Sequence, residues 1–286
     1  MNKLLIICGP TATGKTALAV QIAKKFDGEL VSADSRQVYI GMDIGTGKDR
    51  AKIDVPVWLL DIVNPDEEFS VSVWVKLAGQ AVADILSRNK LPIVVGGTGL
   101  YIHALIHRPE TMDIPPDKKL REKLQNASVG VLQHMIEPTI LQSMNQSDRQ
   151  NPRRLIRKIE IARAKKTLRK SKKIFDCLSV GLTAPQSDLY TRIDDRVDER
   201  LRQGMKEEVE TLIKKFGRNF PSMSALGYRS LEHWKKDEHS YARRQRTWFK
   251  KQKSIEWFDV TGPGYPENVT RSILAWYTRV SDEHKD

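Results

Sequence analysis

The segment GPTATGKT at residues 9–16 constrains this chain more than any other feature. It directly follows the short apolar run KLLIIC, and residues 16–26 then carry apolar side chains at helical spacing, so the segment connects a strand to a helix. In such a loop the glycines let backbone N–H groups converge on phosphate oxygens, and the helix dipole favours an anion. The segment therefore predicts a P-loop for a di- or triphosphate. It leaves open whether that group is transferred, hydrolysed or released.

The side chains of this loop add to its affinity for phosphate. Lys15 supplies a positive charge, and the Thr16 hydroxyl is a ligand for Mg²⁺. The predicted phosphate-binding set is Gly9, Pro10, Thr11, Ala12, Thr13, Gly14, Lys15 and Thr16.

Short apolar runs alternate with a helical pattern in the first part of the chain. Residues 29–33, 57–62 and 91–95 have the composition of strands, and 70–88 carries a helical apolar stripe between the last two. This alternation is typical of a parallel sheet flanked by helices, so we expect an α/β fold of the P-loop NTPase-like kind. Such a sheet binds ligands at the carboxyl ends of its strands, where the glycine-rich turns and Asp34 fall.

The pattern changes after His107. The segment RPETMDIPP breaks regular structure, and about sixty mostly helical and strongly basic residues follow it. We therefore expect 1–110 to form the first part of the core, 111–176 an inserted small helical domain, and 177–286 the rest of the core with C-terminal basic helices. In this last part we expect one helix over 192–216, a strand over 255–260 and a closing helix over 266–280.

The positive charge of the chain is concentrated in two segments. The net charge is +12, yet 149–173 holds twelve Lys or Arg against the single acid Glu160, and 243–253 holds six against none. These two segments together carry +17, so the remainder carries −5. Discrete basic segments on a mildly acidic body indicate a polyanionic partner, with nucleic acid the first candidate.

No run of residues approaches the length of an apolar membrane span, and no signal-peptide pattern precedes the glycine turn, so we expect a cytosolic protein with no membrane partner. Cys8 and Cys177 have no paired spacing for a disulfide framework or a metal site. We interpret both as reduced packing residues.

Longer blocks extend the P-loop pattern along most of the chain: GPTATGKTALAVQIAKKF, ELVSADSRQVYIGMDIGTGK, LPIVVGGTGLYIHAL, NPRRLIRKIEI, LYTRIDDRVDERL, ALGYRSL and YARRQRTWFKKQKSIEWFD. Taken together they resemble the tRNA dimethylallyltransferase family, also called tRNA isopentenyltransferases, in order from the first strand to about Asp259. The ADSRQVY and GMDIGTGK blocks beside a P-loop are far more specific than the P-loop alone.

The resemblance implies transfer of a dimethylallyl group from its diphosphate to N6 of the adenosine immediately 3′ of the anticodon, with Mg²⁺ assisting. The exocyclic amine of adenine is a poor nucleophile, because its lone pair is delocalised into the ring, so its attack must be accompanied by loss of a proton. Asp34 matches the family's general base. The alternatives for Asp34 are a cap at the strand end or a Mg²⁺ ligand.

The resemblance implies that the P-loop residues bind the diphosphate of this donor, and that Asp34, Lys15, Thr11 and Arg192 form the catalytic set. Arg192 matches a family arginine directed at the diphosphate. Its alternative role is a surface ion pair with Asp195 or Asp188.

The resemblance assigns tRNA contacts to residues 35–37, Thr98 and residues 153–157, and the basic composition of YARRQRTWFKK adds Arg243 and Arg244. The helix starting at NPRRLIRKIEI has an apolar side and a basic side, so it can pack and hold phosphates at once. In the C-terminal basic segment, Trp248 and Phe249 are as readily core residues as RNA contacts. The predicted tRNA-binding set is Asp34, Ser35, Arg36, Gln37, Thr98, Arg153, Arg154, Leu155, Ile156, Arg157, Arg243 and Arg244.

Two other functions compete with this one. A P-loop small-molecule kinase would share the sheet and the loop but gives no reason for two basic segments, and a non-catalytic RNA-binding module gives no reason for Asp34 opposite an intact P-loop. We therefore expect a monomeric tRNA dimethylallyltransferase whose partners are a tRNA anticodon stem-loop and dimethylallyl diphosphate, with Mg²⁺ as cofactor.

Overall fold

The computed structural model describes residues 2–164 and 175–279. The chain divides into two compact units: one is Met1–Ile106 with Lys173–Asp286, and the other is His107–Lys172. The first unit holds the sheet and the P-loop, and the second is helical. Part of the first basic segment, 165–174, lies outside the described residues.

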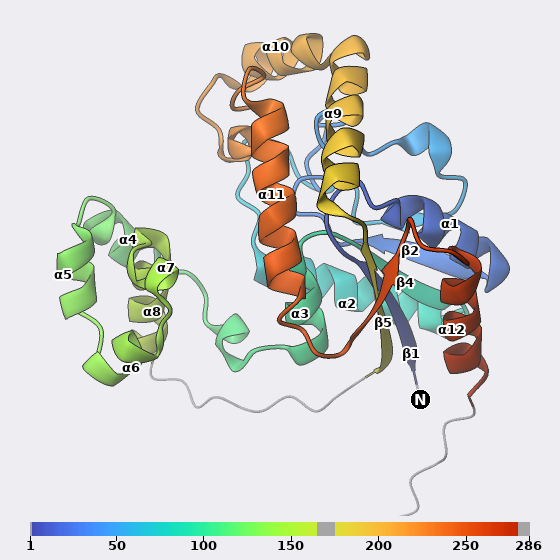
Figure 1. Cartoon of the computed structure of the whole chain (residues 1–286). Helices are drawn as coiled ribbons and strands as arrows, with labels where there is room; N and C mark the ends of the chain where they lie inside the picture. The colour runs from blue at the N-terminus through green and yellow to red at the C-terminus, as the bar shows by residue number, and fades with distance from the viewer. Residues whose placement is uncertain (1, 165–174, 280–286) are drawn as a thin grey trace, which may run out of the picture. The chain divides into compact units, whose positions relative to one another are not determined.

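A six-stranded parallel sheet forms the centre of the first unit, in the order β3-β2-β4-β1-β5-β6 (Figure 1). Its strands are β1 (Lys3–Cys8), β2 (Gly28–Ser32), β3 (Val57–Trp58), β4 (Leu91–Gly96), β5 (Asp176–Thr183) and β6 (Ile255–Asp259). β1 pairs with β4 on one side and with β5 on the other. The α/β fold predicted from the sequence is confirmed.

Alternate residues of β1 face two separate apolar cores. Leu4 and Ile6 belong to the core on one face, and Leu5 and Ile7 to the core on the other, which is the two-residue period of a strand buried on both faces. Helices α1 (Lys15–Lys25) and α12 (Glu267–Thr278) cover the second face. The first face is covered by α2 (Val71–Ser87), α3 (Gly99–His107), α9 (Gln186–Arg202), α10 (Met205–Phe216) and α11 (Trp234–Phe249).

Two expected elements differ from those observed. The run at 57–62 forms only the two-residue β3, because Leu59 and Asp61 have φ values of 66° and 52°, which end the extended backbone. The single helix expected over 192–216 is two helices, α9 and α10, because Gly204 adopts a left-handed φ of 101° between them. α9 begins earlier than expected, at Gln186.

The helical unit has an apolar core of its own, which includes Leu120, Leu132 and Leu155. Its helices are α4 (Lys118–Leu124), α5 (Val129–His134), α6 (Pro138–Ser143), α7 (Gln146–Arg149) and α8 (Pro152–Arg163). Each starts at a polar residue whose side chain accepts a hydrogen bond from the first turn, as Asn151 does from the Arg154 N–H at the start of α8. Among the described residues of the chain, no helix is both long and apolar enough to cross a bilayer.

Candidate active site

The P-loop follows β1, the strand at which the sheet order reverses, so it opens at the carboxyl edge where such sheets bind ligands. Gly9 has no room for a side chain, because an added Cβ would lie 2.3 Å from the Leu182 carbonyl oxygen of β5. Gly14 caps α1 in the left-handed conformation, with a φ of 79°. The buried Thr13 hydroxyl donates to the Pro10 carbonyl at 2.9 Å and fixes the loop from within.

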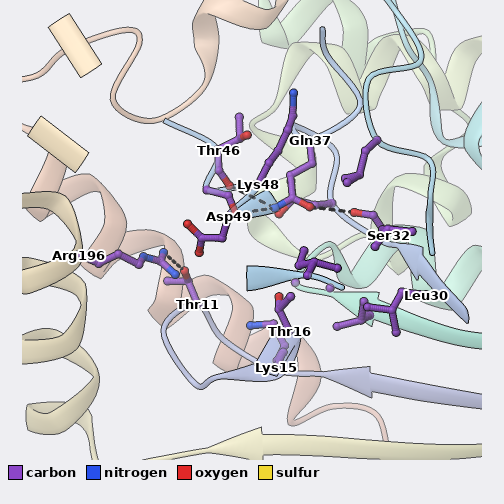
Figure 2. A pocket seen from close by; sticks show the side chains of 18 of the residues that line it. Thr11, Lys15, Thr16, Leu30, Ser32, Gln37, Thr46, Lys48, Asp49 and Arg196 are labelled. Atoms are coloured by element: carbon purple, nitrogen blue, oxygen red, sulfur yellow. Dashed lines mark hydrogen bonds between the residues drawn. The ribbon is translucent and has the colours of Figure 1, made fainter. Parts of the chain in front are cut away.

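Two cationic side chains, Lys15 and Arg196, face the inside of this loop. The Lys15 ammonium donates to the Pro10 carbonyl at 2.6 Å, and Arg196 of α9 donates to the Thr11 hydroxyl (Figure 2). Burial, and then the charge of Arg196, lower the pKa of Lys15 to about 8. The buried Nε of Arg196 has no hydrogen-bond partner among the described residues. A buried guanidinium nitrogen without a hydrogen-bond partner, beside an ammonium of lowered pKa, indicates a binding site for an anion.

Asp34 lies where two pockets meet. It follows β2, and its Oδ1 accepts a hydrogen bond of 2.8 Å from the Arg36 backbone N–H. One pocket is lined by Lys15, Thr16 and Asp34, and a second by Asp34, Arg36 and other residues. The two pockets also share Thr11 and Arg196, so the half-buried carboxylate of Asp34 faces the phosphate side and the adjoining space.

The second pocket is rich in arginine. Arg36, Arg229 and Arg244 line it in addition to Arg196 and Arg200, which it shares with the first pocket. Arg36 donates to the Ser224 hydroxyl at 3.2 Å. This pocket is suited to a ligand that carries negative charge.

The loop at residues 43–49 lines the pocket on the side opposite the P-loop (Figure 2). The Glu208 carboxylate accepts three successive backbone N–H bonds, from Asp43, Ile44 and Gly45, at 3.0, 2.8 and 3.1 Å. The buried Lys48 ammonium donates to the Tyr39 carbonyl at 2.7 Å, and it also pairs with Asp43 and Asp61. Arg200 donates to the Gly45 carbonyl at 3.2 Å. These contacts hold the GMDIGTGK block in place in the pocket that the P-loop also lines.

Three of the residues assigned to tRNA contact are engaged in holding the site together. Gln37 accepts from the Ser32 hydroxyl at 3.0 Å and donates to the Gly47 carbonyl at 3.1 Å (Figure 2). The Thr98 hydroxyl accepts from the Ser35 backbone N–H at 3.0 Å. The side chains of Gln37 and Thr98 therefore support the loop that carries Asp34, whereas Ser35 and Arg36 line the arginine-rich pocket.

Arg192 is not brought to the P-loop. Its side chain is exposed and lines neither pocket, and its charge acts on Asp259 and Tyr265. Arg196, one helical turn later on α9, is the arginine of this helix that contacts the P-loop, through the Thr11 hydroxyl. The two arginines are four residues apart on one helical face, and the sequence does not specify which turn is level with the P-loop.

Gln245 is a site residue that the sequence interpretation missed. This buried residue of α11 accepts from the Thr11 backbone N–H at 2.8 Å and donates to the Gly97 carbonyl at 3.0 Å. A Cβ on Gly97 would lie 2.1 Å from Gln245 Nε2, and one on Gly99 would lie 2.2 Å from Trp248. Because Gly97 and Gly99 have no side chains, α11 can pack closely against the turn that follows β4. The YARRQ block contains this amide, but its charge pattern indicates only the arginines.

The basic helix α8 divides its candidate residues into two groups. Leu155 and Ile156 are buried in the core of the helical unit, so their side chains are not available to an RNA partner. Arg157 is spent internally, since it pairs with the buried Glu160 at 3.0 Å and donates to the Thr111 and Ile114 carbonyls.

The remaining basic candidates are exposed. Arg154 pairs with Asp148, whereas Arg153 and Lys158 are exposed and make no ion pair within the described residues. Arg243 and Arg244 of α11 are also exposed, and Arg244 lies over the Tyr241 ring at 5.8 Å. On the same helix Phe249 is buried and Trp248 half-buried, in keeping with a packing role for both.

The fold and this site define a P-loop protein of the α/β class, with a cationic anion site joined at a carboxylate to an arginine-lined pocket. Sequence models described as "IPP transferase" and "Isopentenyl transferase" match residues 37–252 and 2–53. The chain is similar to the tRNA dimethylallyltransferase of Anoxybacillus flavithermus, with 37% identity over 96% of this chain and 95% of that one. That of Geobacillus thermodenitrificans is 38% identical over 92% of each chain.

Solved structures agree with these relatives. The tRNA isopentenylpyrophosphate transferase of Bacillus halodurans superposes with a TM-score of 0.72 at 34% identity, covering 96% of both chains. A eukaryotic dimethylallyltransferase superposes with a TM-score of 0.77 at 23% identity, covering 99% of this chain and 82% of that one, and it supports the fold. The chain belongs to the tRNA dimethylallyltransferase family and is an enzyme, a prenyltransferase.

Proposed function

We propose that this enzyme transfers a dimethylallyl group from dimethylallyl diphosphate to N6 of the adenosine immediately 3′ of the anticodon in tRNA, and releases diphosphate. The observation that carries the proposal is the position of Asp34 between two joined pockets, one lined by the P-loop and the other by arginines. A donor held by its diphosphate and a base entering from the other pocket would meet at this carboxylate.

On the donor side, the P-loop amides, Lys15 and Arg196 receive the negative charge of the diphosphate. As the bond from the allylic carbon to oxygen breaks, the bonding electrons leave with the diphosphate, so its charge grows in the transition state. The unspent Nε of Arg196 and the destabilised ammonium of Lys15 gain most from that charge. The Thr11 hydroxyl keeps the Arg196 guanidinium beside the loop.

On the acceptor side, N6 of adenine forms the new bond to the allylic carbon and must lose a proton. Asp34 accepts this proton. The backbone N–H of Arg36 orients its Oδ1, and the carboxylate need not be strongly basic, because the amine becomes very acidic as the carbon–nitrogen bond forms. Extrusion of the adenosine into the site costs little free energy, since an anticodon-loop base is single-stranded.

The donor set suits Mg²⁺ as cofactor. Mg²⁺ prefers oxygen ligands and usually keeps waters while it binds one or two protein groups together with substrate phosphates. The half-open site offers the exposed Thr16 at the start of α1 (Figure 2), and the described residues hold no cluster of three or more ligating side chains that would form a cage. Thr16 would hold the ion against the diphosphate, where it would supply charge neutralisation.

The decisive experiment is Asp34→Asn, which keeps the size and one acceptor but removes the basicity. We expect a loss in single-turnover rate on the order of 10²- to 10⁴-fold, the usual contribution of a positioned general base, with tRNA affinity within a few-fold of the parent. The readouts are mass spectrometry of the tRNA nucleosides after incubation with donor and Mg²⁺, and filter binding on the same preparations. Asp195→Asn, at an exposed position of α9, is the matched control.

A near-normal single-turnover rate in Asp34→Asn would show that another group takes the proton. Loss of tRNA binding instead of rate would make Asp34 a recognition residue. Product formed with ATP in place of the allylic diphosphate would overturn the donor assignment itself.

A further inference from the structure

The amide of Gln245 spans the two glycine-containing turns that enclose the phosphate side of the site. Its Oε1 accepts the Thr11 backbone N–H of the P-loop at 2.8 Å, and its Nε2 donates to the Gly97 carbonyl after β4 at 3.0 Å. The side chain is about 6% exposed and lines the pocket that contains Lys15. Both ends of a buried amide are therefore used, one on each turn.

The side chain of Gln245 is closely packed against the turn that follows β4. An added Cβ on Gly97 would lie 2.1 Å from Nε2, and an added Cβ on Gly96 would lie 2.3 Å from the Ala33 carbonyl oxygen, just before Asp34. The end of β4 thus packs against the backbone just before Asp34, and the turn that follows packs against Gln245. A shift of α11 would move this turn and the P-loop together.

Thr11 links Gln245 to the cation that faces the donor. Its backbone N–H is held by Gln245, while its hydroxyl accepts from Arg196 of α9. The place of the guanidinium therefore depends on the place of Thr11, which depends on Gln245. Because the Nε of Arg196 has no hydrogen-bond partner among the described residues, Thr11 is a main restraint on its head group.

We propose that Gln245 is a positioning residue of the prenyl transfer, which sets the Arg196 guanidinium against the leaving diphosphate by fixing Thr11. Gln245 does not touch the reacting atoms. The inference rests on the proposed use of the P-loop for a diphosphate. It separates the two faces of α11: the exposed face carries Arg243 and Arg244, and the buried face, through Gln245, holds the donor loop.

The test is Gln245→Met, which keeps the length of the side chain and removes both polar ends. We expect kcat/KM for the donor to fall about 10²-fold, the scale of a misplacement of about 1 Å in a reacting site, with a raised donor KM and tRNA affinity within about twofold. Thr247→Ala, at an exposed position of the same helix, should leave all three unchanged. Measurements are made well below the thermal midpoint of each variant, so that unfolding does not enter.

A double-mutant cycle with Thr11→Val decides the route. This substitution removes the hydroxyl that Arg196 uses and keeps the N–H, so Gln245→Met should cost less than about threefold more in its background. Additive losses, or a normal donor KM and kcat in Gln245→Met, would overturn the inference. Lys15→Ala separates this inference from the proposed function. If Lys15→Ala is active, the P-loop does not bind the diphosphate in the way proposed. If Lys15→Ala is inactive while Gln245→Met is fully active, the proposed function stands and Gln245 has only a structural role.

Discussion

Arg196 in the core unit and Arg157 in the helical unit are both arginines on helices that the sequence linked to function, yet they differ in how their donors are used. Arg157 pairs with Glu160 and donates to the Thr111 and Ile114 carbonyls. Arg196 donates to the Thr11 hydroxyl, and its buried Nε has no partner among the described residues. A guanidinium whose donors are all paired within the protein stabilises its own unit, whereas one with an unpaired donor is available to a ligand.

The largest expected effect comes from removing the unspent cation. Arg196→Ala should lower kcat about 10²- to 10³-fold, because the leaving group would have one donor fewer for its growing charge. The free energy of unfolding should change little, since the side-chain hydrogen bond of Arg196 is to the Thr11 hydroxyl and its Nε has no partner among the described residues. Single-turnover transfer and thermal unfolding check both parts.

Arg192→Ala, one helical turn earlier at an exposed position, is the matched control and should retain near-normal kcat. A larger loss in Arg192→Ala than in Arg196→Ala would reverse the assignment made from the structure.

The depressed pKa of Lys15 gives the next effect. Below a pH of about 8 the ammonium of the free enzyme is charged and ready for the diphosphate, and above it kcat/KM for the donor should fall about tenfold per pH unit. Stability should move the other way. The folded pKa of about 8 lies below the unfolded 10.5, so the cost of holding this charge is present below pH 8 and is relieved as the pH rises to 10.5.

Lys15→Arg should remove both trends, because arginine stays charged over this range. A donor kcat/KM that is flat from pH 7 to 10 in the unsubstituted enzyme would show that the charge of Lys15 does not control donor binding.

The smallest effects separate the spent and exposed residues of α8. Arg153→Ala with Lys158→Ala should weaken tRNA binding a few-fold and flatten the slope of log K against log salt by up to about two, one for each cation withdrawn from a phosphate. Arg157→Ala should instead destabilise the helical unit by about 1–3 kcal/mol, because the buried Glu160 would lose one of its two arginine partners and keep Arg121 and the Asp117 backbone N–H. An unchanged salt slope in the double variant would show that this helix does not contact the RNA backbone.

The sequence predicted what local patterns determine. The P-loop, the alternation of strands and helices, and Asp34 at the end of β2 all follow from runs of adjacent residues, and the structure has each where it was expected. The catalytic role of Asp34 and the role of Mg²⁺ stay predictions. Leu155 and Ile156 were assigned from a basic stretch, but the apolar stripe of an amphipathic helix faces its own core.

What the sequence did not provide depends on packing between distant segments. Which of Arg192 and Arg196 contacts the P-loop depends on how α9 is positioned along its axis relative to the loop. The role of Gln245 depends on the packing of α11 against Gly97 and Thr11. The length of β3 depends on the φ of Leu59, which no side-chain pattern indicates. The break at Gly204 had a visible signal, because glycine inside a helical pattern favours a boundary.

The position of β1 at the centre of the sheet has a consequence for how the chain folds. β1 is made first, but one of its two neighbours, β5, joins it through pairs such as Lys3 with Asp176. During synthesis at about 5–20 residues per second, that edge of β1 stays unpaired until the whole of 107–164 has emerged. The helical unit has local contacts and its own apolar core, so it can fold while the sheet waits. Closure of the sheet around β1 is therefore the late and slow step, and the nascent chain is most exposed to aggregation just before β5 appears.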